Sequence, residues 1–411
     1  MSISPLKASI GARLDETLHA LNDDLIAFRR DLHQHPELSW HEERTADKIQ
    51  EKLKAWGISS ERAIGTAVVV DIPGNAALPR VIYRGDIDAL PIVDTKDPAR
   101  APWASQNAGL CHACGHDVHT TIALAVARAL YEAREELGAP VRVIFQPAEE
   151  VLPSGAAALA DAGVLDGASV GLALHVDPSR DVGTVAWRNG PITSATDTFE
   201  IQVQGRAGHS ARPHLAHDAI GAAAQITLAI HALGRQFVNP LHTAVLSVGE
   251  LKAGSAPNII AGGATLRGTV RAMNLQDREP LHEALRKTVS AAAALHGCQA
   301  ETKLALGAPP VRNDEELSRL VCEHAADVLG QDQVHWLEYP STGAEDFGVF
   351  SDWMRTFMLR LGCSVPGTDR LHLHEEGFDL DERAILIGAR IMARSVFAAS
   401  REGLDPQPPS P

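Results

Sequence analysis

Apolar and polar positions over the first 150 residues alternate between a helical period and short strands. Leu and Ile recur at three- and four-residue spacings among charged residues over 14–56, which predicts helix with a break near His35 and Pro36. Strands are expected at residues 67–72, 80–83 and 141–145, and an Ala-rich helix at residues 120–136. Strands that alternate with helices favour an α/β domain with a mainly parallel sheet.

The pattern changes between residues 190 and 300. Strand, helix, strand, strand and helix follow one another there, an order that fits a small α+β, ferredoxin-like domain inserted into the larger one. After Pro309 and Pro310 the chain returns to the larger domain and ends in an apolar helix. The expected division is a larger domain of residues 1–189 and 301–404, an inserted domain of residues 190–300, and a disordered tail of residues 405–411.

Composition narrows the classes of partner and compartment. The 411 residues include 37 Lys and Arg against 52 Asp and Glu, a net charge of −15. Because an acidic surface repels phosphate groups, we expect neither nucleic acid nor a membrane as a partner. No apolar run approaches the ~18 residues of a membrane span, and the first 30 residues contain no signal-peptide run. Five scattered cysteines, an odd number, suit a reducing compartment, so we expect a cytoplasmic protein.

Residues 111–119 form the sharpest local cluster, with two cysteines, three histidines and an aspartate. Thiolate and imidazole are the ligands that borderline metals favour, so the cluster predicts a metal site. A structural zinc knuckle would need a second closing pair nearby, and His209 with His214 lies far along the chain. A redox pair of Cys111 and Cys114 lacks its usual surroundings and would leave the histidines unexplained.

Polar residues follow three of the expected strands. In parallel sheets, ligands bind at the carboxyl ends of the strands. Glu149 and Glu150 are adjacent, and neighbouring side chains in an extended segment diverge. One carboxylate could therefore ligate a metal while the other faces substrate as a base. Asp86 and Asp88 fit either support of the metal site or a turn. His175, at the end of an apolar strand, is a ligand only if the others gather around it.

Two more histidines lie near the C-terminus, at His372 and His374. Alternation places both on one face of an expected strand, and only one of them need be a ligand.

Together these motifs resemble the M20 peptidase family, in its branch of hippurate hydrolases, N-acyl-amino-acid amidohydrolases and auxin-conjugate hydrolases. The resemblance spans nearly the whole chain through ordered motifs at residues 30–38, 86–91, 112–117, 146–150, 208–214, 343–347 and 373–374. The sequence departs from the family's Leu-His-x-Pro-x-Phe motif after His374, where Glu375 and Glu376 follow and the proline is lost. His374 is preferred over His372 because it keeps the family's four-residue distance to Phe378.

The resemblance implies a centre of two divalent metal ions, of zinc, manganese, cobalt or nickel. The implied ligands are Cys114, His116, Glu150, His175 and His374. Glu149 is the implied general base. Asp88, with Asp86 and Asp117, is expected to hold the ligand imidazoles in one tautomer and is counted with the catalytic residues.

The resemblance further implies that residues 190–300 form a lid through which the chain makes a homodimer or higher oligomer. His209 would act as a catalytic donor and Asn258 would reach the substrate, within one chain or across the subunit boundary. Arg271 is the candidate for a substrate carboxylate, and His374 also borders the substrate pocket.

The implied activity is hydrolysis of an N-acyl amino acid or similar small amide to a carboxylate and an amine. A dipeptidase and a hydrolytic deaminase are alternatives, because the same two-metal chemistry serves both. A structural zinc protein and a non-catalytic binding protein that keeps its metals are more distant alternatives. The presence of Glu149 beside a full ligand set counts against the last, because a binding protein needs no base.

Overall fold

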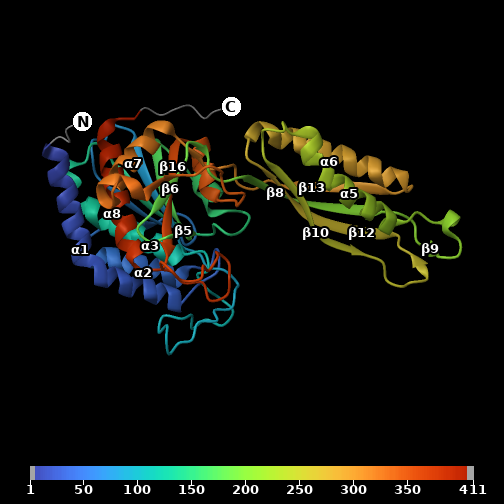
Figure 1. Cartoon of the computed structure of the whole chain (residues 1–411), viewed down its shortest axis with the longest axis horizontal. Coiled ribbons are helices and arrows are strands. Elements are labelled where there is room, and N and C mark those ends of the chain that lie inside the picture. The colour runs from blue at the N-terminus through green and yellow to red at the C-terminus, as the bar shows by residue number, and fades with distance from the viewer. Residues whose placement is uncertain (1–4, 405–411) are drawn as a thin grey trace. The chain divides into compact units, whose positions relative to one another are not determined.

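The chain divides into two compact units in a computed structural model, which describes residues 5–404 (Figure 1). Within these residues the first unit comprises the chain up to residue 192, 311–339 and the chain from 349, and the second comprises 193–310 and 340–348. The predicted boundaries differ from this division at 190–192, 301–310 and 340–348. The last segment joins the second unit because Arg271 Nη1 and Ser194 Oγ both donate to the Thr342 carbonyl, at 2.7 and 2.8 Å. The expected disordered tail lies outside the described residues.

The first unit is built on a sheet of ten strands. Its strands are β1 (Glu61–Arg62), β2 (Val68–Ile72), β3 (Arg80–Asp86), β4 (Val141–Gln146), β5 (Ala168–Asp181), β6 (Val185–Trp187), β7 (Gly190–Pro191), β14 (Arg312–Asn313), β15 (Val334–Trp336) and β16 (Arg355–Ser364). The centre of the sheet runs β4-β3-β5-β16-β14 with every neighbouring pair parallel. The expectation of an α/β fold with a mainly parallel sheet is confirmed.

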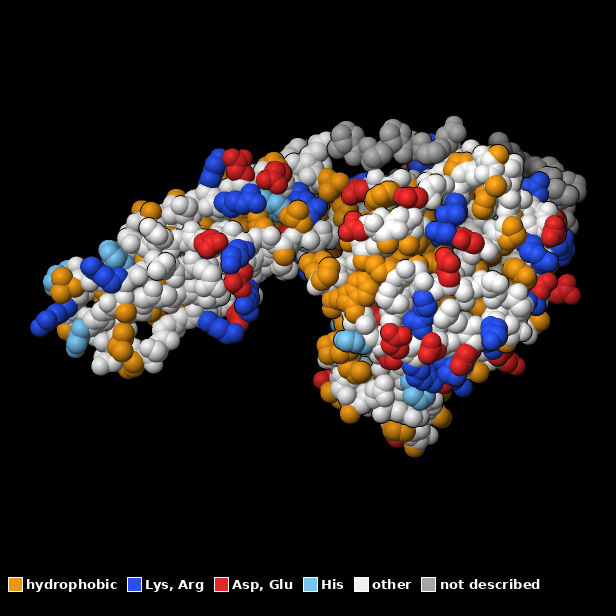
Figure 2. Space-filling model, turned by 180° about the vertical axis from the view of Figure 1, so that it is seen from behind, with side chains coloured by type: hydrophobic (Ala, Val, Ile, Leu, Met, Phe, Trp, Pro, Cys, Tyr) orange, Lys and Arg blue, Asp and Glu red, His pale blue; other side chains and the backbone are white. Residues whose placement is uncertain are grey.

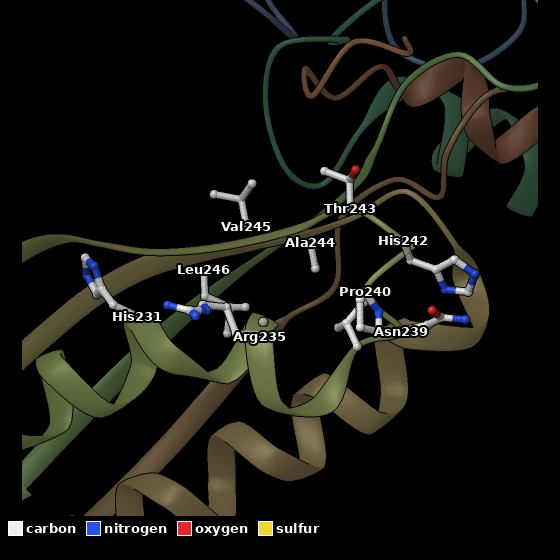
Figure 3. A pocket seen from close by; sticks show the side chains of 11 residues that line it. His231, Arg235, Asn239, Pro240, His242, Thr243, Ala244, Val245 and Leu246 are labelled. Carbon is white, nitrogen blue, oxygen red and sulfur yellow. The ribbon is translucent and has the colours of Figure 1, made fainter.

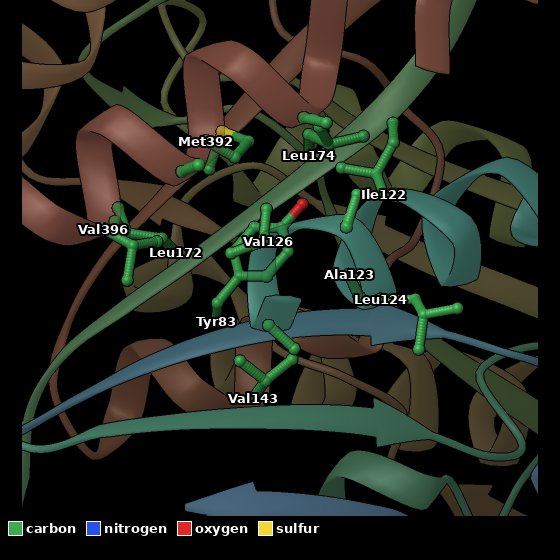
Figure 4. Close-up of a cluster of buried hydrophobic side chains, with 14 of the residues drawn as sticks. Tyr83, Ile122, Ala123, Leu124, Val126, Val143, Leu172, Leu174, Met392 and Val396 are labelled. Atoms are coloured by element: carbon green, nitrogen blue, oxygen red, sulfur yellow. The ribbon is translucent and has the colours of Figure 1, made fainter. Parts of the chain in front are cut away.

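Helices cover this sheet and seal its core. They are α1 (Pro5–Gln34), α2 (Glu43–Ala55), α3 (His116–Glu132), α4 (Gly155–Asp161), α7 (Glu315–Leu329) and α8 (Arg383–Glu402). In Figure 4, Ile122 of α3 and Met392 of α8 lie against Leu172 and Leu174 of β5, and all four side chains are buried. Burial of one such side chain contributes about 2 kcal/mol, so this face stabilises the strands that carry the site.

The helix predicted from residue 120 begins earlier, at His116. Gly115, just before it, has φ +83, which a residue with a side chain rarely adopts, and a Cβ there would lie 2.5 Å from Val176 Cγ2. This glycine brings the start of α3 close to β5. The break predicted near His35 and Pro36 is confirmed, since α1 ends at Gln34 and α2 begins at Glu43.

The second unit has the strand order of a ferredoxin-like fold. Its elements are β8 (Ala195–Gln204), β9 (Gly208–His209), α5 (Ala219–Phe237), β10 (Ala244–Ala253), β11 (Ile259–Ile260), β12 (Gly263–Ala272), α6 (Leu275–Leu295) and β13 (Gln299–Ala305). The antiparallel sheet runs β10-β12-β8-β13, with β10 at one edge, and β9 pairs with β11 as a separate ribbon. The sequence pattern missed β13, whose residues are mostly polar, and this short ribbon.

The visible face of the first unit mixes the two signs of charge. Figure 2 shows Asp and Glu side chains interspersed with Lys and Arg there, with no broad field of one sign. Over residues 5–404, no helix combines the length and apolarity that crossing a lipid bilayer requires.

Candidate metal centre and active site

Three neighbouring parallel strands carry the acidic and imidazole candidates. Asp88 follows the end of β3, and Glu149 and Glu150 follow the end of β4. His175 lies within β5, which continues to Asp181, so the expectation that His175 ends its strand was wrong. The strand continues because β16 pairs with it beyond His175. Cys114 lies just before α3 and is buried.

Two groups of three candidate ligands share Cys114 among the described residues. One group is Cys114, His116 and His175, and the other is Cys114, Glu150 and His374, with the ligand atoms of each group within 4.8 Å of one another. Cys114 Sγ lies 3.5 Å from His175 Nε2, and Glu150 Oε1 lies 3.2 Å from His374 Nε2. The structure therefore brings all five predicted ligands together. A shared thiolate between two groups is the arrangement that would suit two neighbouring cations.

Hydrogen bonds turn the two buried imidazoles toward the shared thiol. His175 Nδ1 donates to the Val176 carbonyl at 2.7 Å, and His116 Nδ1 donates to the Asp88 carbonyl at 2.9 Å. Because a carbonyl oxygen only accepts, each Nδ1 carries the proton and each Nε2 keeps its lone pair. This is the usual way in which proteins prepare histidine as a metal ligand.

Two of the candidate ligand atoms have charged neighbours but no hydrogen-bond partner among the described residues. Within the described chain, His116 Nε2 and Glu150 Oε1 are buried and accept or donate no hydrogen bond. Buried polar atoms without partners cost free energy, so they indicate a missing ligand. Thiol, imidazole and carboxylate together match a divalent transition metal, and the residues present therefore fit such ions.

Burial alone works against a thiolate at this position. Burial raises the pKa of the Cys114 thiol well above its ordinary value, and the negative charge of Glu150 adds to the rise. Burial likewise lowers the pKa of His175 well below its ordinary value, with His119 and Arg360 acting in the same direction. Neutral imidazole is the ligating form, and a thiol in this environment ionises when a cation is bound.

His119 and Asp86 lie close to the centre but are already committed to other partners. His119 Nδ1 lies 2.7 Å from Asp86 Oδ1, and its Nε2 accepts the Val176 N–H at 2.9 Å. Asp86 also forms a buried ion pair with Arg84. These two side chains therefore support the centre and leave no free lone pair on His119 for a metal.

Glu149 lies beside the ligand set. A carboxylate oxygen of Glu149, a ring nitrogen of His116 and a carboxylate oxygen of Glu150 all lie within 4.8 Å of one another. The Glu149 side chain is half-buried. Adjacent carboxylates thus reach the same centre, one of them in the group that contains Cys114.

The C-terminal segment that carries His374 is a loop with turns, so the expected strand over His372 and His374 was wrong. His374 has φ +65, and its N–H donates to the Ala113 carbonyl at 2.8 Å. Gly377, at φ +78, bends the same loop. The turns break the alternation that would have placed both histidines on one face, and His374 alone of the pair is in the Cys114–Glu150 group.

The second unit holds the remaining candidates. His209 on β9 pairs with Ile259, and the Ser210 N–H donates to the Asn258 carbonyl at 3.1 Å, so His209 and Asn258 lie on one ribbon. Both are exposed. His209 Nδ1 accepts the Ala211 N–H at 3.1 Å, which leaves the proton of the neutral ring on Nε2. Arg271 lies on β12 of the main sheet of this unit, and its guanidinium is bonded to Thr342.

A pocket of about 640 Å³ also lies in this unit, between the end of α5 and the start of β10 (Figure 3). His231, Arg235 and His242 are among its lining residues. It contains none of the predicted site residues and lies on the edge of the sheet, so we do not assign the chemistry to it.

Sequence reasoning missed the residues that hold the loop after β4. Ser39 Oγ donates to Asp88 Oδ2 at 2.7 Å, and the Glu150 N–H donates to the same oxygen at 3.1 Å. The Ala148 N–H donates to Glu42 Oε1 at 2.9 Å. The only signal was the loss of helical period over residues 35–42, between α1 and α2, where polar and apolar residues are mixed.

Known proteins share this fold and these motifs. Residues 82–398 match the model of peptidase family M20/M25/M40. The chain is 36% identical over 376 residues to an N-acetylcysteine deacetylase of Bacillus subtilis, covering 91% of this chain and 96% of that protein. It is 36% identical over 294 residues to an N-acyl-L-amino acid amidohydrolase of Geobacillus stearothermophilus, covering 71% of this chain and 79% of that protein.

A solved structure extends the similarity to three dimensions. It is that of a dinuclear metal binding peptidase of the M20 family from Bacillus subtilis, with a TM-score of 0.80 and 34% identity, covering 93% of this chain and 99% of that one. This similarity and the candidate ligand groups support two metal ions. The chain therefore belongs to peptidase family M20/M25/M40 and is a hydrolase.

Proposed function

We propose that the protein is a metal-dependent amidohydrolase that cleaves an N-acyl amino acid, or a similar small amide, to a carboxylate and an amine. The observation that carries the proposal is the pair of ligand groups that share Cys114, with Glu149 beside them. Relatives named for deacetylation of N-acetylcysteine and for hydrolysis of N-acyl amino acids support this substrate class.

Cys114, His116, Glu150, His175 and His374 would hold two divalent ions. When bound, the ions supply Lewis-acid activation of water and of the amide carbonyl. The thiol of Cys114 favours zinc, cobalt or nickel, whereas the imidazole and carboxylate majority also accepts manganese.

Glu149 is the general base in this proposal. Its carboxylate takes a proton from the attacking water as the water oxygen bonds to the amide carbon, and it delivers that proton to the amine nitrogen as the C–N bond breaks. Asp88 holds the ring of His116 and the backbone of Glu150 in place.

The second unit supplies the substrate contacts in this proposal. His209, with its proton on Nε2, is a ready donor to the oxyanion that develops on the carbonyl oxygen. Asn258 shares its ribbon, and Arg271 would pair with a substrate carboxylate.

We also propose that the second unit forms a homodimer. Its edge strand β10 offers unpaired backbone groups, which favour pairing with another chain. Leu241, between α5 and β10, and Leu228 of α5 are 91% and 71% exposed. A Leu228→Glu variant should sediment as a monomer while Leu295→Glu, a control at a leucine of α6 that is also largely exposed, stays a dimer. A monomeric wild type would contradict the proposal.

The test of the activity is a product analysis. The purified chain, loaded separately with zinc, cobalt or manganese, is incubated with a panel of N-acetyl and N-benzoyl amino acids, dipeptides and aryl amines. We expect a free amino acid and a carboxylate from the first class. Two amino acids would indicate a dipeptidase and ammonia a deaminase, and either as the dominant product would overturn the proposal.

A further inference from the structure

Glu42 is a buried carboxylate that the proposed chemistry does not use. Its side chain is fully buried, and it stands at the start of α2 without capping that helix. Three neutral groups donate to it: the N–H of Trp40 at 3.0 Å, the N–H of Ala148 at 2.9 Å and the Thr66 hydroxyl at 2.6 Å. Within the part of the chain that the structure describes, no ion pair links it to Lys or Arg.

Such a position is costly for a charged group. Burial raises the pKa of the Glu42 carboxyl, and the hydrogen bond from Thr66 opposes that rise. Two of the three partners are backbone N–H groups, which can only donate, so the geometry fits an acceptor at this position. A buried group that costs free energy without an ion partner needs a function that its hydrogen bonds explain.

One of these hydrogen bonds fixes Ala148, the residue before the two glutamates. Ala148 has φ +53, a conformation that costs a non-glycine residue free energy unless its surroundings hold it there. Its N–H is bonded to Glu42, and its carbonyl accepts the N–H of Gly155 at 2.9 Å. The conformation of Ala148 sets the direction in which the next residue, Glu149, leaves β4.

The same segment also reaches Glu150. Ser39 donates to the Asp88 oxygen that accepts the Glu150 N–H. The indole of Trp40, itself at φ +67, donates to the Pro153 carbonyl at 3.0 Å. The residues between α1 and α2 thus hold the loop after β4 at three points.

We propose that Glu42 is a positioning residue of the hydrolase, whose carboxylate holds Ala148 in its left-handed conformation and thereby aims Glu149 at the metal centre. The proposal rests on the assignment of Glu149 as base. It predicts that geometry matters more than charge at position 42.

Two substitutions separate geometry from charge. Glu42→Gln keeps one oxygen to accept the Trp40 and Ala148 N–H groups, and the Thr66 hydroxyl can turn to accept from the new amide. Glu42→Asp keeps the charge but is one methylene too short to reach Ala148. We expect kcat of Glu42→Asp to fall about 100-fold with KM changed less than about threefold, and Glu42→Gln to stay within about threefold of wild type.

Glu37 offers a matched control in the same segment. Its carboxylate accepts the N–H groups of Arg44 and Thr45 at the start of α2, and among the described residues it has no hydrogen bond to the loop after β4. Glu37→Ala should lower the melting temperature because the helix loses its cap, while kcat stays within about twofold of wild type.

The measurements are kcat and KM on an N-acetyl amino acid, metal content by mass spectrometry, and hydrogen–deuterium exchange of the peptide containing residues 146–152 in metal-free protein. We expect faster exchange of this peptide in Glu42→Asp, wild-type exchange in Glu42→Gln, and wild-type metal content in both. Equal loss of kcat in Glu42→Gln and Glu42→Asp, wild-type kcat in Glu42→Asp, or a loss explained by lost metal would overturn the proposal. If wild type cleaves no amide, the proposed function fails, and the exchange data still decide whether Glu42 holds the loop.

Discussion

The two units prepare their candidate residues in opposite ways. In the first unit, His116, His175 and Asp88 are buried, and each has a hydrogen bond that fixes its orientation. In the second unit, His209 and Asn258 are exposed on a short two-stranded ribbon. The difference teaches that the candidate metal ligands are held in place by the core, whereas the candidate substrate contacts lie on an exposed surface that the protein itself does not fix.

The comparison predicts the largest effect on turnover at Glu149, the proposed general base in the first unit. Glu149→Gln should lower kcat about 1,000-fold, because the amide cannot take the proton from water, while bound metal stays at the wild-type level. The neighbouring control, Glu150→Gln, should instead lose metal. Kinetics with an N-acetyl amino acid and metal analysis of both variants check this. A Glu149→Gln enzyme with near-normal turnover would remove the base from the mechanism.

The exposed half should affect turnover without affecting the metals. His209→Ala should lower kcat about 100-fold, the usual loss for one oxyanion donor, with metal content unchanged. His214→Ala, an exposed histidine in the same loop, is the control and should behave as wild type. Loss of metal in His209→Ala, or equal loss of kcat in both variants, would contradict the proposal that His209 acts on turnover independently of metal binding.

In the first unit, the buried His33 should make the free energy of unfolding depend on pH. Burial and Arg29 lower the pKa of His33, but Asp117 and Asp94 outweigh them and raise it to about 9. Because the folded pKa lies above the unfolded value, the stabilisation is complete below about pH 6.5 and is lost as pH rises through about 9. The free energy of unfolding should fall by about 2.5 kcal/mol between pH 7 and pH 10 through this group.

Urea unfolding of wild type and His33→Gln at both values of pH isolates that contribution. The variant should be less stable at pH 7 and should show a flatter pH dependence. Parallel curves for the two proteins would mean that His33 does not carry the charge in the native state.

The smallest effect is expected one step away from the ligands. Asp88→Asn places an amide against donors from Ser39, Glu150 and His116, so at least one of them loses its acceptor. Metal affinity should fall about tenfold, with the fold intact. Competition with a chelator measures it, and Asp332→Asn at an exposed position is the control. An unchanged metal affinity would show that Asp88 does not support the metal site.

The sequence predicted much of the fold because periodicity and turn residues are local. The strands β2, β3 and β4, the break between α1 and α2 and the inserted antiparallel unit could be read from them, whereas the central parallel strand β16 was not predicted. It did not predict the loop that carries His374, because the left-handed conformation of His374 depends on its contact with Ala113, far away in the chain. Nor could it predict β13, whose polar residues pair with β8 through backbone hydrogen bonds.

The same reasoning applies to the site. Cys114, His116, Glu150, His175 and His374 were named from motifs, and the structure places them together. The support from Glu42 and Ser39 escaped prediction because a buried carboxylate and a hydroxyl have no distinctive spacing. Only the three-dimensional contacts with Ala148 and Asp88 reveal what they hold.

The central proposal is that these five side chains would together hold two divalent ions. Anomalous X-ray diffraction from crystals of the zinc-loaded protein tests it most directly. The account predicts two anomalous peaks, both bound by side chains of the set Cys114, His116, Glu150, His175 and His374. A single peak, or peaks bound by other side chains, would contradict it.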